Sequence, residues 1–122
     1  MQLVWLAVAG AAGTLLRYAV SRAAQPLGGT TFPAGTLLVN VSGAFVLGFL
    51  ATFLLGRTAV SAEARTAITI GLLGAYTTFS TFSMETLELM NGGHWAYATV
   101  NVLLSVTAAL FAMWAGQSLA RM

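Results

Sequence analysis

The fold is decided by the stretch GLLGAYTTFSTFS, which covers residues 71–83. It lies in the middle of a longer segment, 66–90, whose midpoint is Thr78. Its six hydroxyl side chains compete for backbone hydrogen bonds, and its two glycines lower helix propensity. We therefore predict a membrane helix that is broken between Gly74 and Thr78, near the bilayer midplane. Irregular backbone at that depth must be buried in protein or line a cavity, and its freed carbonyls can bind a cation.

The composition of the whole chain indicates an integral membrane protein. Of its 122 residues, 58% are hydrophobic and only 7% are charged. In a soluble domain about a quarter of the residues are charged, so this chain has too few charged residues to cover a water-exposed surface. It also has no cysteine and no basic patch. These features exclude a water-soluble enzyme, a disordered chain and a disulfide-stabilised secreted domain, and they do not support nucleic-acid binding.

Four segments are long enough to cross a bilayer, since a membrane helix needs about 20 mostly apolar residues. We therefore expect one all-α membrane domain over residues 1–122, with four transmembrane helices and no further domain. The expected spans are 3–24, 33–55, 66–90 and 95–119.

The positive charges give the chain almost no preferred orientation. Four spans place both termini beside the second connection, and that side carries three arginines, Arg57, Arg65 and Arg121. The opposite side carries two, Arg17 and Arg22. A difference of one does not fix an orientation. Two interpretations stay open: the orientation is weakly encoded, or the chain inserts both ways and assembles as an antiparallel dimer.

Polar side chains recur on single faces of the second and fourth spans. They are Thr36, Asn40 and Gly43 in the second span, and Tyr97, Asn101 and Ser105 in the fourth. Such groups either form interhelical hydrogen bonds, worth about 1 kcal/mol or less in membranes, or line a permeation path. For Asn40 alone the packing role is favoured, whereas both roles stay open for the stripe in the fourth span.

The third segment combines aromatic rings with hydroxyls. If the helix resumes after the break, Phe79 and Phe82 share one face, and their electropositive ring edges favour an anion. Arg17 and Glu85 either reach toward the membrane surface or form a charged vestibule. The sequence does not tell which residues they pair with.

No catalytic or metal-ligating motif accompanies these features. There is no HExxH or Walker sequence, and the single histidine, His94, lacks ligand partners. A small four-helix exporter needs a carboxylate inside the membrane, in its first helix, where this chain has Arg17 instead. A membrane scaffold, with hydroxyls that serve packing only, is the other alternative.

Three separated motifs resemble the Fluc (CrcB) family of fluoride channels. They are GTLLRY at 13–18, GTLLVNVSG at 35–43 and GLLGAYTTFSTFS at 71–83. The third is highly specific, and the resemblance extends over the whole chain. It implies a passive channel, not an enzyme, that exports toxic fluoride across the bacterial inner membrane. It also implies an antiparallel, dual-topology homodimer with two pores, in contact with lipid and with no other protein partner.

The resemblance further implies roles for individual residues. The backbone carbonyls of Gly74 and Thr77 would hold a structural sodium ion at the dimer centre, and Arg17 and Glu85 match vestibule positions. The expected fluoride path is lined by Asn40, Thr78, Phe79, Ser80, Thr81, Phe82, Tyr97, Asn101 and Ser105.

Two positions depart from the family pattern. Asn101 stands where a serine is expected, which bears on the local hydrogen bonding, and Ala75-Tyr76 replaces a glycine followed by a hydrophobic residue, which bears on packing beside the ion. The expected mechanism does not change. Fluoride is strongly hydrated, so neutral donors and ring edges must replace its water, and weakly enough to release it again.

Overall fold

The computed structural model describes residues 1–122 and contains only helices and their connections. The long helices are α1 (Gln2–Ala24), α2 (Ala34–Leu55), α5 (Phe79–Asn91) and α6 (Trp95–Ala120). The shorter elements are η1 (Gln25–Gly28), α3 (Ala62–Thr66), η2 (Ala67–Leu73) and α4 (Gly74–Tyr76).

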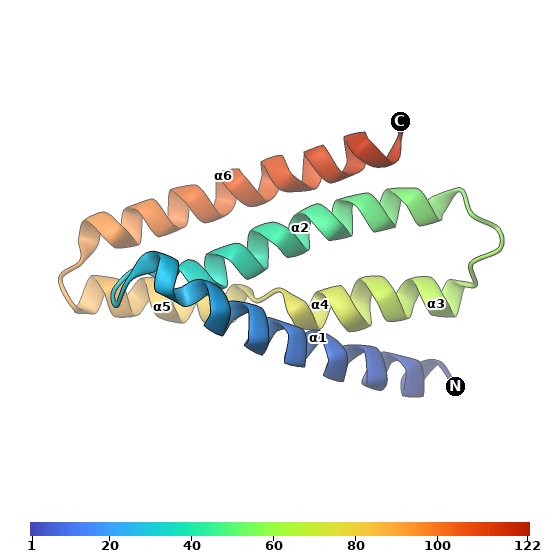
Figure 1. Ribbon diagram of the computed structural model, residues 1–122, viewed down its shortest axis with the longest axis horizontal. Helices are drawn as coiled ribbons and strands as arrows, with labels where there is room; N and C mark the ends of the chain where they lie inside the picture. Colours follow the sequence, from blue (N-terminus) through green and yellow to red (C-terminus); the bar gives the residue numbers. More distant parts are fainter.

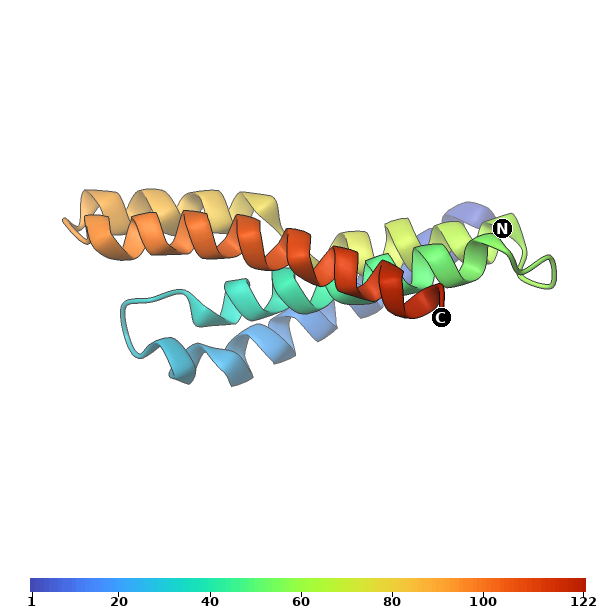
Figure 2. The same cartoon turned by 90° about the horizontal axis from the view of Figure 1, so that it is seen from above.

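The helices run lengthwise through one elongated bundle (Figure 1). α2 and α6 lie side by side, while α1 crosses the segment that α3, η2 and α4 form. Both termini and the α2–α3 connection lie at one end of the molecule, and the connections α1–α2 and α5–α6 lie at the other. Seen from above, the α5–α6 hairpin and the α1–α2 hairpin diverge toward that second end (Figure 2).

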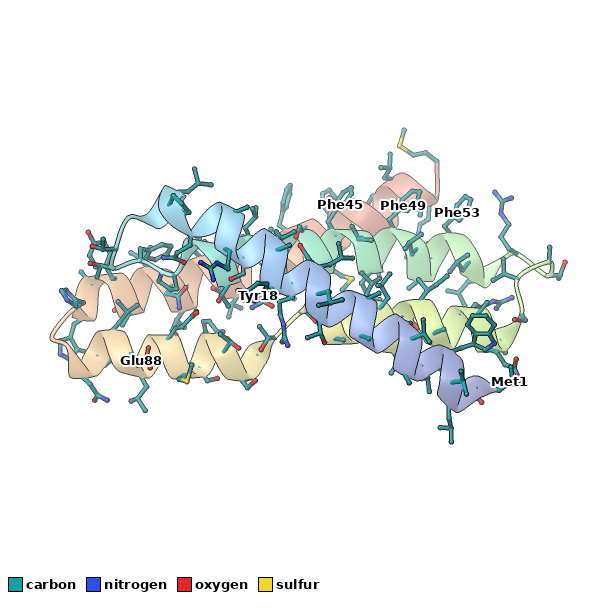
Figure 3. The ribbon with its side chains drawn as sticks, turned by 60° about the horizontal axis from the view of Figure 1, so that its bottom comes forward. Met1, Tyr18, Phe45, Phe49, Phe53 and Glu88 are labelled. Atoms are coloured by element: carbon teal, nitrogen blue, oxygen red, sulfur yellow. The ribbon has the colours of Figure 1, made fainter.

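Three helical segments are long and apolar enough to cross a membrane: 2–28, 34–55 and 95–120. Their outer faces carry large apolar side chains such as Leu15 and Phe111, which are 69% and 65% exposed. On α2, Phe45, Phe49 and Phe53 follow one another along one side (Figure 3). Exposed apolar surface on this scale suits lipid and not water, so the chain is a multi-pass membrane protein.

α2 and α6 touch backbone to backbone. A Cβ added to Gly116 would collide with the carbonyl of Phe45, and one added to Gly48 would collide with the carbonyl of Met113. Small residues allow membrane helices to approach in this way, since packing replaces the absent hydrophobic effect. This pair is therefore the close-packed part of the bundle.

α1 packs in the same manner on η2, which is a π-helix of seven residues. A Cβ on Gly13 would collide with the carbonyl of Leu72, and one on Gly71 would come within 2.9 Å of the Ala9 Cβ. π-helical turns are rare in proteins, and those that occur are often found at functional sites. This one is separated from the break only by the three residues of α4.

The predicted break of the third helix is confirmed. α4 ends at Tyr76, and the next two residues are extended, with φ −81° and ψ 158° at Thr77 and φ −153° and ψ 112° at Thr78. The helix resumes at Phe79. Gly74 is still helical, so the break occupies only the end of the predicted stretch.

Candidate functional site

The extended backbone at the break is bound by a side chain of α2. The amide nitrogen of Asn40 donates to the carbonyl of Thr78 over 2.9 Å, and the Thr78 N–H donates to the Asn40 amide oxygen over 2.7 Å. Asn40 therefore takes the place of both helical partners of this residue. Since unpaired backbone groups in lipid cost several kcal/mol each, this contact stabilises the break.

The break leaves backbone carbonyls without their helical donors, and those of Gly74 and Thr77 are among them. In a continuous α-helix the Gly74 carbonyl would accept from the Thr78 N–H, which donates to Asn40 instead. The Thr77 carbonyl would accept from the Thr81 N–H, which donates to the Thr78 hydroxyl instead, over 3.2 Å. Oxygen atoms freed from a helix in this way are the ligands that sodium takes in broken membrane helices. Gly74 and Thr77 therefore fit the chemistry of the ion that the sequence led us to expect.

The predicted polar face of α2 meets the broken helix along its length. Beyond Asn40, the Ser42 hydroxyl lies 2.9 Å from the Tyr76 hydroxyl. A Cβ on Gly43 would collide with the Thr77 side chain. The break is thus bound by α2 on both of its sides.

A cavity of about 380 Å³ opens beside the break. The rings of Phe79 and Phe82 lie on its wall with their centroids 5.4 Å apart and their planes tilted by 44°. Its neutral polar lining comes from Asn40, Thr77, Thr78 and Ser105. Phe79 is 78% exposed, so the wall that it forms is open to the outside of the chain.

A second cavity, of about 290 Å³, lies on the other side of Thr78. Its lining includes Arg17 and Arg22 of α1, Thr36 of α2 and Thr81 of α5, and none of its lining residues is acidic. The Thr78 side chain also accepts a hydrogen bond from the N–H of Thr81, so that it caps α5. The positive end of this helix dipole adds to the arginine charges.

Arg17 and Glu85 face different cavities. Glu85 lines a third one, of about 380 Å³, between the α1–α2 connection and α5. It accepts a hydrogen bond of 2.8 Å from the Thr36 hydroxyl, and its other carboxylate oxygen is buried without a partner. Because Thr36 also lines the Arg17 cavity, this threonine joins the two predicted vestibule residues. Glu88, which lines the third cavity as well, is labelled on α5 in Figure 3.

The polar stripe of α6 is divided among three environments. Ser105 lines the cavity of the two phenylalanines, whereas Tyr97 lies near the ring of Phe32, with centroids 6.1 Å apart, at the end of the bundle. Asn101 is 2% exposed and donates to the Thr86 hydroxyl over 2.9 Å. Ser80 is exposed and lies 3.3 Å from the Thr78 hydroxyl.

Sequence reasoning missed several of these partners, namely Ser42, Tyr76 and Thr86. Tyr76 appeared only as a departure from an expected pattern, and Thr86 carried no signal beyond being a hydroxyl near the end of the third segment. Helical periodicity indicates which way a side chain points. It does not indicate which side chain of another helix it meets.

Residues 4–117 match the protein family described as CrcB-like protein, Camphor Resistance (CrcB). Three similar proteins are each named fluoride-specific ion channel FluC. The one from Methylococcus capsulatus is 50% identical over 121 residues, which cover 99% of this chain and 53% of that protein. The one from Citrifermentans bemidjiense is 48% identical over 120 residues, 98% of this chain and 97% of that protein. The one from Magnetococcus marinus is 42% identical over 122 residues, 100% of this chain and 99% of that protein.

The chain therefore spans about half of the Methylococcus protein and nearly all of the other two.

Proposed function

Because this chain belongs to the CrcB family of fluoride-specific ion channels, we propose that it conducts fluoride passively out of the cell, as an antiparallel homodimer with two pores. The observation that carries this proposal is the cavity at the break. Neutral donors and the two phenylalanine rings line it together, at the middle of the third span.

The lining suits a small, strongly hydrated anion. Asn40 uses one amide hydrogen on Thr78, and its second is free to face the cavity, because an amide carries two donors. The hydroxyl of Ser105 and the edges of Phe79 and Phe82 add further positive groups without formal charge. Neutral groups replace the water of the ion and still let it leave.

The second cavity, which Arg17 and Arg22 line and which we call the arginine cavity, is the proposed entrance. Arg17, Arg22 and the N-terminus of α5 attract an anion toward Thr78 and Thr81. Since Thr78 lines both this cavity and that of the phenylalanines, an ion that reaches it is adjacent to the proposed path. Glu85 lies outside this cavity and acts on it through Thr36.

A second copy of the chain completes the proposed site. Phe79, Ser80 and Ser83 are exposed on one side of α5, close to the middle of the third span. In a lone chain the two serine hydroxyls would therefore face lipid, and polar groups in lipid cost free energy. Gly74, in α4, is also exposed. Two copies related by a two-fold axis would bury these groups, with the carbonyls of Gly74 and Thr77 from both copies around one sodium ion. Its positive charge would offset the repulsion between those carbonyls.

Efflux from liposomes tests the function. The purified protein is reconstituted in vesicles loaded with fluoride or with chloride, and the release of each ion is measured with a selective electrode. We expect rapid fluoride release and negligible chloride release. Phe82→Ile should lower the fluoride rate by about threefold to tenfold, since an aromatic contact is worth about 0.5–1.5 kcal/mol. Phe111→Ile, an exposed ring of α6 outside the cavity, is the control and should leave the rate unchanged.

Release that does not differ from protein-free vesicles would refute the channel, and equal release of both ions would refute its selectivity. The sodium ion has a separate test. Replacing sodium by N-methylglucamine should dissociate the dimer or stop conduction, while restoring sodium should reverse the effect. A dimer that conducts equally in both media would refute the sodium site and leave the channel standing.

A further inference from the structure

Asn101 is one of the two most completely buried large side chains of the chain, at 2% exposure, and the other, Val39, is apolar. A buried amide in a membrane protein must find partners for two donors and an acceptor. Asn101 finds an acceptor for one of these donors on α5 and a donor for its oxygen on α6, and it lies outside the lining of the three cavities described above.

Its hydrogen bonds form a directed chain. The Ser105 hydroxyl donates to the Asn101 amide oxygen over 3.4 Å, and the Asn101 amide donates to the Thr86 hydroxyl over 2.9 Å. The Thr86 hydroxyl then donates to the carbonyl of Phe82 over 2.7 Å. The chain thus begins and ends at residues that line the phenylalanine cavity.

The bond between Asn101 and Thr86 is the one side-chain hydrogen bond that joins α5 to α6. No glycine brings these two helices together, in contrast to α2 and α6. α5 is also bounded by the break before Phe79 and by the Gly92-Gly93 turn, where Gly93 has a φ of +79°. The orientation of α5 relative to α6 therefore depends strongly on this pair.

We propose that Asn101 and Thr86 are a positioning pair, which fixes Phe82 against α6 so that its ring faces Ser105 across the path. Asn101 acts through this bond and not by contacting the ion. The inference rests on the proposed function, because it assigns a role in fluoride conduction. It also explains the asparagine at a position where the family pattern led us to expect serine, since a serine side chain is too short to bridge to Thr86 in the same way.

Single-channel recording tests the pair, because the current through one open dimer does not depend on how much protein folds. Thr86→Val removes the hydroxyl with little change in shape, and Asn101→Ser removes the reach of the amide. Each should lower the fluoride current by about threefold to tenfold, the range that follows from measured membrane hydrogen bonds. The double variant should conduct no worse than the more severe single one, because both changes break the same bond.

Two further variants give matched controls. Thr107 donates to the carbonyl of Leu103 over 2.7 Å, as Thr86 does to that of Phe82, but it is exposed on α6. Thr107→Val should leave the current unchanged. Thr86→Ser keeps the hydroxyl and should retain at least about half of the wild-type current, as expected if the bond persists.

A spectroscopic measurement reports the position of the ring directly. With 4-fluorophenylalanine at position 82, the ¹⁹F resonance should shift or broaden alike in Thr86→Val and Asn101→Ser and stay unchanged in Thr107→Val. If Thr86→Val does not yield folded dimer, Asn101→Ser and Thr86→Ser still provide the comparison.

The outcomes separate this inference from the proposed function. A wild-type protein that carries no fluoride current refutes the function and the inference with it. A conducting wild type whose two single variants have independent, additive effects, or whose ¹⁹F resonance is the same in every variant, refutes the pair alone. Full current in Thr86→Val together with a reduced current in Asn101→Ser would show instead that Asn101 contacts the ion.

Discussion

α5 and α6 both pack against α2, but they do so by opposite means. α6 meets it through Gly48 and Gly116, where the backbones are so close that no Cβ fits. α5 and the break before it meet it through side-chain hydrogen bonds, from Asn40 to Thr78 and from Thr36 to Glu85. The α2–α6 contact thus depends on close packing of the backbones, and the α2–α5 contact depends on a few directional hydrogen bonds.

The difference divides the molecule into a scaffold, formed by α2 and α6, and a candidate site, formed by the break and α5. Close-packed backbones tolerate almost no change in volume, so the pair of α2 and α6 is rigid. Hydrogen bonds between membrane helices are worth about 0.6 kcal/mol on average, so α5 is held by several weak contacts. The rings of Phe79 and Phe82 lie on this weakly held element. We therefore expect substitutions in the α2–α6 contact to change folding, and substitutions at the α2–α5 contacts to change conduction.

The largest effect is expected at the scaffold. Gly116→Val places a branched side chain against the carbonyl of Phe45 and should destabilise the folded protein by about 3 kcal/mol or more, at the upper end of the cost of overpacking. Thermal unfolding followed by size-exclusion chromatography in detergent measures this. Gly56→Val is the control, since a Cβ there meets nothing within 4 Å. Equal melting temperatures for the two variants would show that the α2–α6 contact is no more rigid than the rest.

The next largest effect is expected at the break. Asn40→Asp retains an acceptor for the Thr78 N–H but loses the donor to the Thr78 carbonyl. It also brings a carboxylate to the wall of the proposed anion path. An unpaired buried group costs about 1–3 kcal/mol, so fluoride efflux should fall by at least about tenfold while the protein stays folded. Asn91→Asp makes the same chemical change at the exposed end of α5 and should have no effect. Normal efflux in Asn40→Asp would refute the role of this amide.

Much of this arrangement could be predicted because it depends on local chemistry. The hydroxyls and glycines of residues 71–83 weaken a helix wherever they stand, and the structure has its break within that stretch. The spacing of Thr36, Asn40 and Gly43 likewise predicts one face of α2, and all three contact the broken helix.

The remainder depends on distances between helices, which periodicity does not contain. Tyr97, Asn101 and Ser105 share one face of a helix, yet α6 is longer than the helices it packs against, so they reach different neighbours. The family resemblance gives Arg17 and Glu85 as vestibule residues without saying what each contacts, and the structure has them on two cavities joined by Thr36. The π-helical turns of η2, on which α1 packs closely, also have no signature in composition.

Thr36→Val tests the second polar contact of α5 and should have an intermediate effect. It removes the only hydrogen bond of Glu85 with little change in volume. We expect fluoride efflux to fall by about threefold, in keeping with one membrane hydrogen bond, because the carboxylate is then free to move toward the arginine cavity. Thr99→Val, which removes an exposed bond within α6, is the control. A melting temperature that falls while efflux is unchanged would assign Thr36 to the scaffold and weaken the comparison.

Tyr76→Phe tests the contact between Tyr76 and Ser42 of α2, and we expect the smallest effect from it. The variant loses the contact with Ser42 on the near side of the break, but Ser42 keeps its bond to the Val39 carbonyl at 3.2 Å, so no donor is left unpaired. We expect fluoride efflux to fall by less than about threefold, as for one average membrane hydrogen bond. Tyr18→Phe, which loses an exposed bond to Arg22, controls for removal of a phenol. If Tyr76→Phe instead lowered efflux as much as Asn40→Asp, the break would be held equally from both sides. The carbonyls of Gly74 and Thr77 would then depend on Tyr76 as much as on Asn40 for the loss of their helical donors.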